Sequence, residues 1–534
     1  MAKRLTERKK NWIERTVDND RSYKTIVYNR AFTSIFFVLL QLAILVAFLG
    51  LGEYGLVWQL FVGILSVAVV IYLAGRQGRH PTRMLWIILI LVVPFVGLPL
   101  YLMYGDGKPA ALMRRKYNQA QKKLGAPASA KGAAEPGRAG GITNALEKMG
   151  YPTYFDGEVT YYATGKEFFE AMKESLRRAK KYILMEYFIV AGGKMWSDIL
   201  KLLLQKADEG VKIKIIYDDF GSILCLPPYY WSYLESLHKN IKCLTFNKVY
   251  PIFSARYNHR DHRKIFVVDG KEAFTGGVNI ADEYIDEKKR FGYWKDTGIR
   301  VRGLAVESFT RTFLEIWLAF KEPKLDFAPY LQQQLKEEEE SESKGLEEQD
   351  SNGKATVILP CADSPLDKLL VSETMYTEMI NRATEYLYIT TPYLVLDEQI
   401  RDSLCLAAMR GVDVRIVTPG IPDKKAVYRL TRANYKELLM SGVKIYEYTP
   451  GFMHAKMTLS DGYAVVGTTN YDYRSLYLHF ENMVYFKDEQ AIKEITKDFK
   501  EIFLVSKERK LSDVKRSVIG KIVDTILRLF EPLL

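Results

Sequence analysis

The chain has 534 residues, of which 48% are hydrophobic, and its 76 Lys and Arg against 64 Asp and Glu give a formal net charge of +12. This near-average composition excludes a wholly disordered protein and one that lies entirely within a membrane. The positive balance favours an anionic partner such as a phosphate, a lipid headgroup or a nucleic acid. The four cysteines form no CxxC pair, which argues against a zinc site or a disulfide framework and indicates reduced thiols.

Hydrophobicity is concentrated near the N-terminus. A basic segment, residues 1–30, precedes apolar runs at Ala31–Leu51, Leu56–Leu73 and Met84–Tyr104. About 20 apolar residues suffice for a helix to cross a bilayer, so residues 31–104 are predicted to form a membrane anchor. The third run is broken in its second half by prolines and a glycine, which leaves both a kinked span and a re-entrant segment open.

The distribution of basic residues indicates how this anchor is oriented. The loop Ala74–Arg83 contains three arginines and no acid. With the basic N-terminus it points to the cytoplasm by the positive-inside rule. Two spans and a re-entrant segment leave the rest of the chain cytoplasmic, whereas three spans place it outside. We favour a multi-pass plasma-membrane protein whose remaining chain, residues 105–534, is cytoplasmic.

Composition divides the remaining chain. Residues 105–150 are basic and then rich in Gly, Ala and Pro, which is typical of a linker. Residues 336–350 contain eight acids and two lysines, which predicts a disordered acidic linker over 331–354. The predicted α/β domains are therefore 151–330 and 355–508. The last segment, 509–534, is a basic amphipathic helix that either lies on an anionic membrane or packs on the domain.

The two α/β domains repeat each other. KYILMEYFIV at 181–190 resembles EYLYITTPYL at 385–394, and EGVKIKIIYDD at 209–219 resembles RGVDVRIVTPG at 410–420. KNIKCLTFN at 239–247 likewise resembles SGVKIYEYT at 441–449. Strands that alternate with helices predict a largely parallel α/β sheet in each half. A duplicated domain, with its halves paired about a pseudo-two-fold axis, is the simplest interpretation.

The strongest repeat carries polar side chains. Both halves contain His-x-Lys-x4-Asp followed by a Gly-rich turn and an asparagine. On a strand, residues two apart share a face, so each histidine projects beside its lysine while the aspartate lies at the turn that ends the strand. The predicted catalytic residues are His262, Lys264 and Asp269 in the first copy and His454, Lys456 and Asp461 in the second, and Asn279 and Asn470 are predicted to bind phosphate.

Paired halves would bring these groups into one pocket. Two lysines and two asparagine amides suit the binding of a phosphate. Two imidazoles suit double displacement, in which one attacks phosphorus and the other transfers protons to the leaving oxygen and from the incoming one.

These two motifs, together with PFVGLPLYLMYG (94–105), GGVNIADEY (276–284), FGYWKDTGIRVRG (291–303) and GTTNYDYRS (467–475), resemble the phospholipase D superfamily and, within it, the bacterial cardiolipin synthase family. The likeness covers essentially the whole chain. It implies two phospholipase D-like α/β/α sandwich domains paired pseudo-symmetrically, plus N-terminal transmembrane α-helices.

The resemblance also implies a reaction. Two phosphatidylglycerol molecules give cardiolipin and glycerol through a phosphatidyl-histidine, with no metal and no other cofactor. In this superfamily an acid downstream orients each histidine, and the matching positions are Asp296 and Glu481. His262 is expected to be the nucleophile and His454 the acid and base. The expected partners are phosphatidylglycerol and anionic membrane lipid, with no nucleic acid; oligomeric state is left open.

Two residues depart from the family pattern. His479 stands where asparagine is usual, and we expect a packing or hydrogen-bonding role for it. Asp261 precedes His262, where its charge is expected to favour the imidazolium. His80, His238 and His259 are expected to be structural, interfacial or solvated. The competing interpretations are a hydrolytic phospholipase D, a phosphodiesterase or nuclease of the same superfamily, and a catalytically inactive membrane scaffold.

Overall fold

The computed structural model describes Leu39 and residues 55–76, 83–104, 108–125, 141–155, 157–249, 258–331, 356–514 and 517–529. The basic N-terminus, the first apolar run apart from Leu39, His80 and the predicted acidic linker apart from Leu331 lie outside the described residues.

The first half is built around a seven-stranded sheet with the order β1-β9-β7-β6-β2-β3-β4. Strands β2, β3 and β4 are parallel, and every other neighbouring pair is antiparallel. The expectation of a largely parallel sheet is therefore wrong, because after β4 the chain returns through antiparallel β6 and β7. The strands are β1 (Glu158–Tyr162), β2 (Tyr182–Tyr187), β3 (Lys212–Asp218), β4 (Ile241–Phe246), β6 (Lys264–Val268), β7 (Glu272–Gly276) and β9 (Gly298–Arg302).

The second half repeats this topology. Its strands follow the path β10-β19-β17-β16-β11-β13-β14-β20, in which β11, β13 and β14 are parallel. The segments that resemble one another in sequence occupy equivalent strands, so the repeat seen in the sequence is also a repeat of topology. The strands are β10 (Val357–Asp363), β11 (Tyr386–Thr390), β13 (Asp413–Pro419), β14 (Lys444–Tyr448), β16 (Met457–Ser460), β17 (Tyr463–Gly467), β19 (His479–Lys487) and β20 (Ser506–Arg509).

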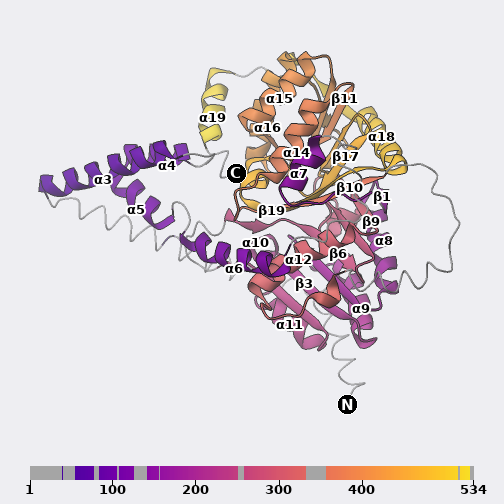
Figure 1. Ribbon diagram of the computed structural model, residues 1–534. Coiled ribbons are helices and arrows are strands. Elements are labelled where there is room, and N and C mark those ends of the chain that lie inside the picture. The colour runs from indigo at the N-terminus through magenta and orange to yellow at the C-terminus, as the bar shows by residue number, and fades with distance from the viewer. Residues whose placement is uncertain are drawn as a thin grey trace.

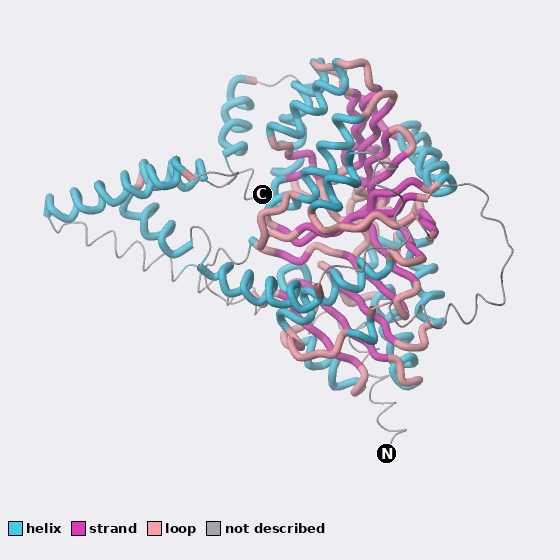
Figure 2. Tube along the Cα trace, viewed as in Figure 1, coloured by secondary structure: helices cyan, strands magenta, loops and turns pink. Residues whose placement is uncertain are grey.

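Helices cover both faces of each sheet, and the halves lie against each other (Figure 1, Figure 2). The outer helices are α8 (Gly165–Arg178), α9 (Lys194–Asp208) and α11 (Tyr230–Leu237) in the first half, and α14 (Val371–Arg382), α15 (Glu398–Met409) and α16 (Lys425–Met440) in the second. Local sequence sets these elements. Thr164, for example, begins α8 with a capping box that includes Glu167, and Phe168, Met172 and Leu176 then bury one face of the helix.

A continuous apolar core joins the two halves. Its central cluster contains Ile265 and Trp317 from the first half and Met457 and Val484 from the second. Two helices contribute to this cluster, α12 (Val306–Phe320) and α18 (Glu489–Leu504), and separate clusters lie under the outer helices. Pairing of the halves is therefore stabilised by burial of apolar surface and is not a loose contact between domains.

Two stretches of the predicted 105–150 linker are ordered helices, so that prediction is wrong for them. Helix α6 (Lys108–Leu124) contacts α12, and α7 (Gly141–Lys148) contacts α14. Their apolar residues recur at helical spacing, a signal that the Gly, Ala and Pro between them obscures. The buried side chains are Met113, Tyr117, Ala120 and Leu124 on α6 and Ile142 and Leu146 on α7.

The N-terminal helices extend away from the paired sheets (Figure 1). They are α3 (Gly55–Gly75), α4 (Arg83–Val92) and α5 (Pro94–Tyr104). The third apolar run forms two helices, because α4 ends at Val92 and Pro94 begins α5. At Gly97 an added Cβ would lie 2.4 Å from the Leu89 carbonyl oxygen, so glycine permits the close approach of α4 and α5. In the part of the chain that is described, no helix meets the length and hydrophobicity required of a membrane span.

Candidate active site

Each catalytic-motif histidine is positioned by a strand of the other half. The short strand β5 (Arg260–Asp261) pairs with β19, and the His262 N–H donates to the Phe480 carbonyl at 2.9 Å. In the same way β15 (Gly451–Met453) pairs with β8 (Tyr293–Lys295), and the His454 N–H donates to the Lys295 carbonyl at 2.8 Å. His262 lies before β6 and His454 lies before β16. Contrary to the expectation, the histidine and the lysine of a motif therefore do not lie on one strand.

The carboxylates also come from the opposite half. His262 Nδ1 lies 2.9 Å from both Glu481 oxygens, and His454 Nδ1 lies 2.5 Å from Asp296 Oδ2. Both acids are fully buried, whereas the histidine side chains are each 10% exposed. Because a carboxylate only accepts hydrogen bonds, the neutral His262 imidazole carries its hydrogen on Nδ1 and presents the lone pair of Nε2. Neither half contains a complete site.

The two lysines are buried beside their histidines. Lys264 Nζ donates to the His262 carbonyl at 2.7 Å, and Lys456 Nζ donates to the His454 carbonyl at 2.6 Å. Burial lowers the pKa of Lys264 to about 7 and that of Lys456 to about 8. The two lysines also repel each other, so a bound phosphate would stabilise both cations.

Both histidines are neutral in the absence of substrate. Burial lowers the pKa of each well below its usual range, and the lysines of both halves lower it further. The expectation that Asp261 favours the His262 imidazolium is wrong, because these larger effects outweigh it and burial raises the pKa of Asp261 itself to about 6. A neutral imidazole is the form that attacks phosphorus.

The motif aspartates bond backbone N–H groups and not the catalytic-motif histidines. Asp269 and Asp461 end their hairpin strands with φ of 54° and 46°, each before a glycine with positive φ. The Asp269 carboxylate accepts backbone N–H groups of residues 180–182 at 2.7–2.8 Å, and Asp461 accepts those of 384–386 at 2.7–3.2 Å. A strand of five residues, about 16 Å, separates Asp269 from His262. Both were predicted to be catalytic; the structure gives them a role in holding strands together.

The asparagines following the motifs are partly engaged. Asn279 accepts the Ile189 N–H at 3.1 Å and donates to Tyr284 Oη at 2.7 Å. Asn470 donates to Asp472 at 3.0 Å, and its buried Oδ1 has no hydrogen-bond partner among the described residues. Each amide retains a second N–H, so phosphate binding by these residues stays a prediction.

Several residues at the site are not evident from the motifs. Asn482 accepts the Lys264 backbone N–H at 3.1 Å and donates to Thr275 at 2.8 Å, joining the two halves beneath the site. Aromatic rings surround the histidines unequally, and only their three-dimensional positions reveal this. The Phe188 ring centroid lies 5.0 Å from that of His262. Three rings lie near His454, with centroid distances of 5.2 Å for Trp294, 5.4 Å for Tyr284 and 5.7 Å for Phe452.

The remaining histidines differ in position. His259 lies at the interface, with Nδ1 3.3 Å from the Leu478 carbonyl, and His238 lies 3.6 Å from Asp208 at the end of α11. His479, for which a packing or hydrogen-bonding role was expected, lies in the site itself. Its ring centroid is 5.6 Å from that of His262, and its Nδ1 is 3.6 Å from Glu481 Oε1.

Comparison with protein families gives two matches. The family described as "Cardiolipin synthase, PLD-like domain" matches residues 172–294 and 376–503, one stretch in each half. The family described as "Phospholipase_D-nuclease N-terminal" matches residues 64–105, which include parts of α3 and the whole of α4 and α5.

Two relatives match this chain over most of their length. The chain is 33% identical to cardiolipin synthase 2 of Bacillus anthracis over 86% of its own length and 88% of that protein. It is 40% identical to an uncharacterised protein of Streptococcus mutans, over 88% of its own length and all of that protein. Among solved structures, a phosphatidylserine synthase of Haemophilus influenzae aligns with a TM-score of 0.54 at 14% identity, covering 74% of this chain and all of that one. This last likeness concerns the fold alone.

Proposed function

The chain belongs to the cardiolipin synthase family of the phospholipase D superfamily and is a phosphatidyltransferase, and we propose that it joins two phosphatidylglycerol molecules into cardiolipin with release of glycerol. The observation that supports this reaction most directly is the pair of neutral, buried histidines, each bonded through Nδ1 to a carboxylate of the other half. Such a pair supplies a nucleophile and a separate proton carrier for one phosphodiester.

In the first step, His262 Nε2 attacks the phosphorus of one phosphatidylglycerol. The P–N bond forms, the bond from phosphorus to the glycerol oxygen breaks, and His454 donates a proton to that oxygen. Burial raises the pKa of Asp296 to about 7, so the Asp296–His454 pair holds a proton near neutral pH. The incoming anionic phosphate favours placing that proton on the imidazole. This supports His454 as the acid and His262 as the nucleophile.

In the second step, the terminal hydroxyl of another phosphatidylglycerol attacks the phosphatidyl-histidine. His454 removes the hydroxyl proton, the P–N bond breaks, and cardiolipin leaves. Lys264 and Lys456 stabilise the charge that develops on the phosphate oxygens, and Asn279 and Asn470 are proposed to donate their second N–H groups. One phosphodiester bond replaces another, so the two reaction steps require no cofactor to supply energy.

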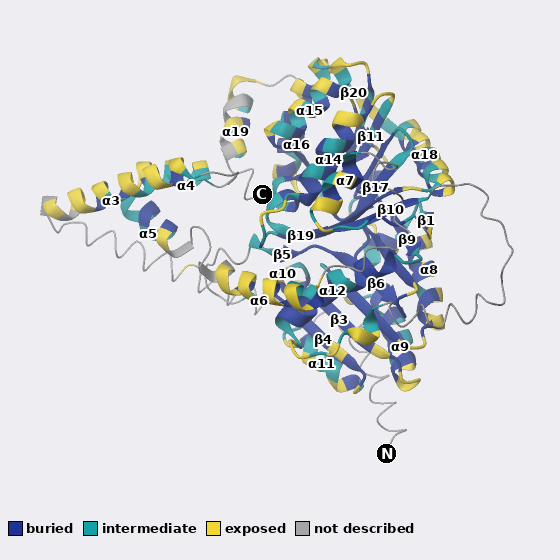
Figure 3. Ribbon diagram, viewed as in Figure 1, coloured by how far each residue is buried: buried dark blue, intermediate teal, exposed yellow. Residues whose placement is uncertain are grey.

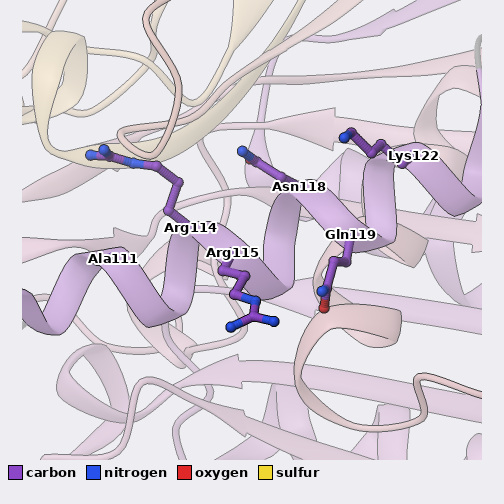
Figure 4. Close-up of a pocket in the computed structure, with 6 residues that line it drawn as sticks. All are labelled: Ala111, Arg114, Arg115, Asn118, Gln119 and Lys122. Carbon is purple, nitrogen blue, oxygen red and sulfur yellow. The ribbon is translucent and has the colours of Figure 1, made fainter.

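We further propose that residues 31–104 anchor the protein in the plasma membrane, with the catalytic halves on the cytoplasmic side. Apolar side chains of α3 are largely exposed, including Val57 at 81% and Ile64 at 71% (Figure 3). The outward face of α6, which follows α5, carries a hollow with three basic residues and no acid, suited to lipid phosphates. Figure 4 shows its lining: Ala111, Arg114, Arg115, Asn118, Gln119 and Lys122.

The C-terminal helix α19 (Val518–Leu529) is the other proposed membrane contact. It is held to α16 by the ion pair of Arg429 and Asp524, at 2.5 Å, while Val518 and Ile519 are about three-quarters exposed, at 73% and 75%. A helix fixed on one side and apolar on the other suits the bilayer interface. We retain the division into halves at 151–330 and 355–508, with α6 and α7 belonging structurally to the halves on which they pack.

The test is incubation of the purified full-length protein with phosphatidylglycerol vesicles and a chelator, followed by lipid and glycerol analysis. Cardiolipin and glycerol in equal amounts are expected. Phosphatidic acid in place of cardiolipin would indicate a hydrolase, and release of nucleotides from DNA without lipid turnover would indicate a nuclease. His262→Ala and His454→Ala are each expected to abolish cardiolipin formation, and retained activity in either would contradict the two-histidine mechanism.

A further inference from the structure

A second histidine lies beside the proposed nucleophile. Ligand atoms of His262, His479 and Glu481 all lie within 4.8 Å of one another. His262 Nδ1 is 2.9 Å from Glu481, and His479 Nδ1 is 3.6 Å from Glu481 Oε1. Among the described residues no second histidine joins His454 in such a group, and the rings near it are those of Trp294, Tyr284 and Phe452.

The three groups fit the requirements of a zinc-class ion. Imidazole nitrogen and carboxylate oxygen bind Zn²⁺ at about 2.0–2.2 Å, which places tetrahedral ligand atoms about 3.4 Å apart. The observed separations of 2.9 and 3.6 Å lie on either side of that value. The buried His479 Nδ1 has no hydrogen-bond partner among the described residues. A water molecule would complete the coordination.

We propose that His262, His479 and Glu481 form an inhibitory binding site for Zn²⁺ or a similar transition-metal ion. This goes beyond the proposed reaction, for which the metal is no cofactor.

Inhibition follows from the single hydrogen of each neutral imidazole. In the absence of metal, His262 Nδ1–H donates to Glu481 and Nε2 carries the lone pair that attacks phosphorus. When Nδ1 donates its lone pair to a metal ion, the hydrogen moves to Nε2. The ring is then unable to attack, and no proton is gained or lost. Metal binding also replaces the hydrogen bond to Glu481 that orients the ring.

His479 undergoes the same change of tautomer. At present Arg474 Nε donates to His479 Nε2 over 3.4 Å, which is at the limit of hydrogen bonding, so the ring hydrogen lies on Nδ1. When His479 binds the metal ion through Nδ1, the hydrogen bond that is lost is this long one from Arg474. Lys264, whose Nζ bonds the His262 carbonyl, opposes a nearby dication, and the carboxylate of Glu481 offsets that charge.

The experiment compares the full-length protein with His479→Asn, and with His238→Asn as a matched control that removes a histidine at the end of α11. After chelator treatment, ZnCl₂ is titrated into the phosphatidylglycerol assay, and each variant is scored against its own metal-free activity. We expect the half-inhibitory concentration to rise at least about tenfold in His479→Asn and to stay unchanged in His238→Asn. Equal sensitivity of His479→Asn and the unmodified protein, or no inhibition of the latter, would overturn the proposal.

A second readout does not depend on catalysis. Co²⁺ bound by two imidazoles and a carboxylate absorbs visible light, so titration with CoCl₂ should give a band in the unmodified protein and in His238→Asn but not in His479→Asn. A band of equal intensity in His479→Asn would refute the site. If His479→Asn does not fold, His479→Gln takes its place in both measurements. Absence of cardiolipin formation with a normal cobalt band would refute the reaction and leave the metal site intact.

Discussion

The bond between Glu481 and His262 offers the sharpest test of how the halves cooperate. Glu481→Gln keeps the size and burial of the side chain but removes its negative charge. Gln can still accept the His262 Nδ1–H through its oxygen, or it can donate an N–H to Nδ1 and force the hydrogen onto Nε2. The second arrangement removes the nucleophilic lone pair, although Glu481 belongs to the other half of the chain.

The expected loss of kcat/KM in Glu481→Gln can be estimated from this hydrogen bond. A hydrogen bond to a charged group contributes about 1.5–3 kcal/mol, and each 1.36 kcal/mol corresponds to about tenfold in rate, so its loss alone costs about 10–150-fold. Reversal of the tautomer raises the loss to about 10⁴-fold in a comparable acid–histidine pair. We therefore expect kcat/KM for cardiolipin formation to fall by about 10–10⁴-fold, depending on which arrangement the glutamine adopts.

The assay is cardiolipin formation from phosphatidylglycerol vesicles, together with urea unfolding to compare stability. Glu272→Gln is the matched control, because Glu272 is also buried but is bonded to Ser175 and Arg302 away from the histidines. We expect this control to lose stability and keep its kcat/KM. Activity of Glu481→Gln within about threefold of the unmodified enzyme would refute the proposed role of the acid supplied by the opposite half.

Three further predictions concern stability. Asp269→Ala removes the acceptor of three backbone N–H groups. The free energy of unfolding measured in urea should fall by about 2–3 kcal/mol, while the folded protein keeps its kcat. A large loss of kcat at unchanged stability would show that this aspartate is catalytic. Tyr117→Ala should destabilise the protein by about 3–5 kcal/mol, as for other large buried rings, whereas the exposed neighbour Lys116→Ala should be near neutral; equal effects would contradict the packing of α6. Burial raises the pKa of Asp296 from 3.8 to about 7, so the folded state binds the extra proton between these values, and the stability it contributes is fully present below pH 4 and lost as pH rises through 7. Asp296→Asn should therefore flatten the fall of the urea midpoint from pH 4 to 7, and an unchanged slope would show that this carboxyl is ionised throughout.

The sequence by itself determined the duplication, the two histidines and the two lysines, because these depend on local spacing that survives in any fold of the chain. It also indicated Asp296 and Glu481 through family likeness. It counted Asp269 and Asp461 as catalytic although it placed them at the turn, since a motif does not show which groups a side chain bonds in the folded chain. It obscured α6 and α7, whose apolar residues are diluted by the Gly- and Ala-rich stretch between them.

Only the tertiary structure decided which acid serves which histidine. Glu481 reaches His262 and Asp296 reaches His454 because β5 pairs with β19 and β8 pairs with β15 across the two halves. These contacts join residues 219 and 158 positions apart, and no local pattern encodes such pairings. The same packing places His479 beside His262, and burial in that shared interior, more than the residue types themselves, makes both imidazoles neutral and ready for chemistry.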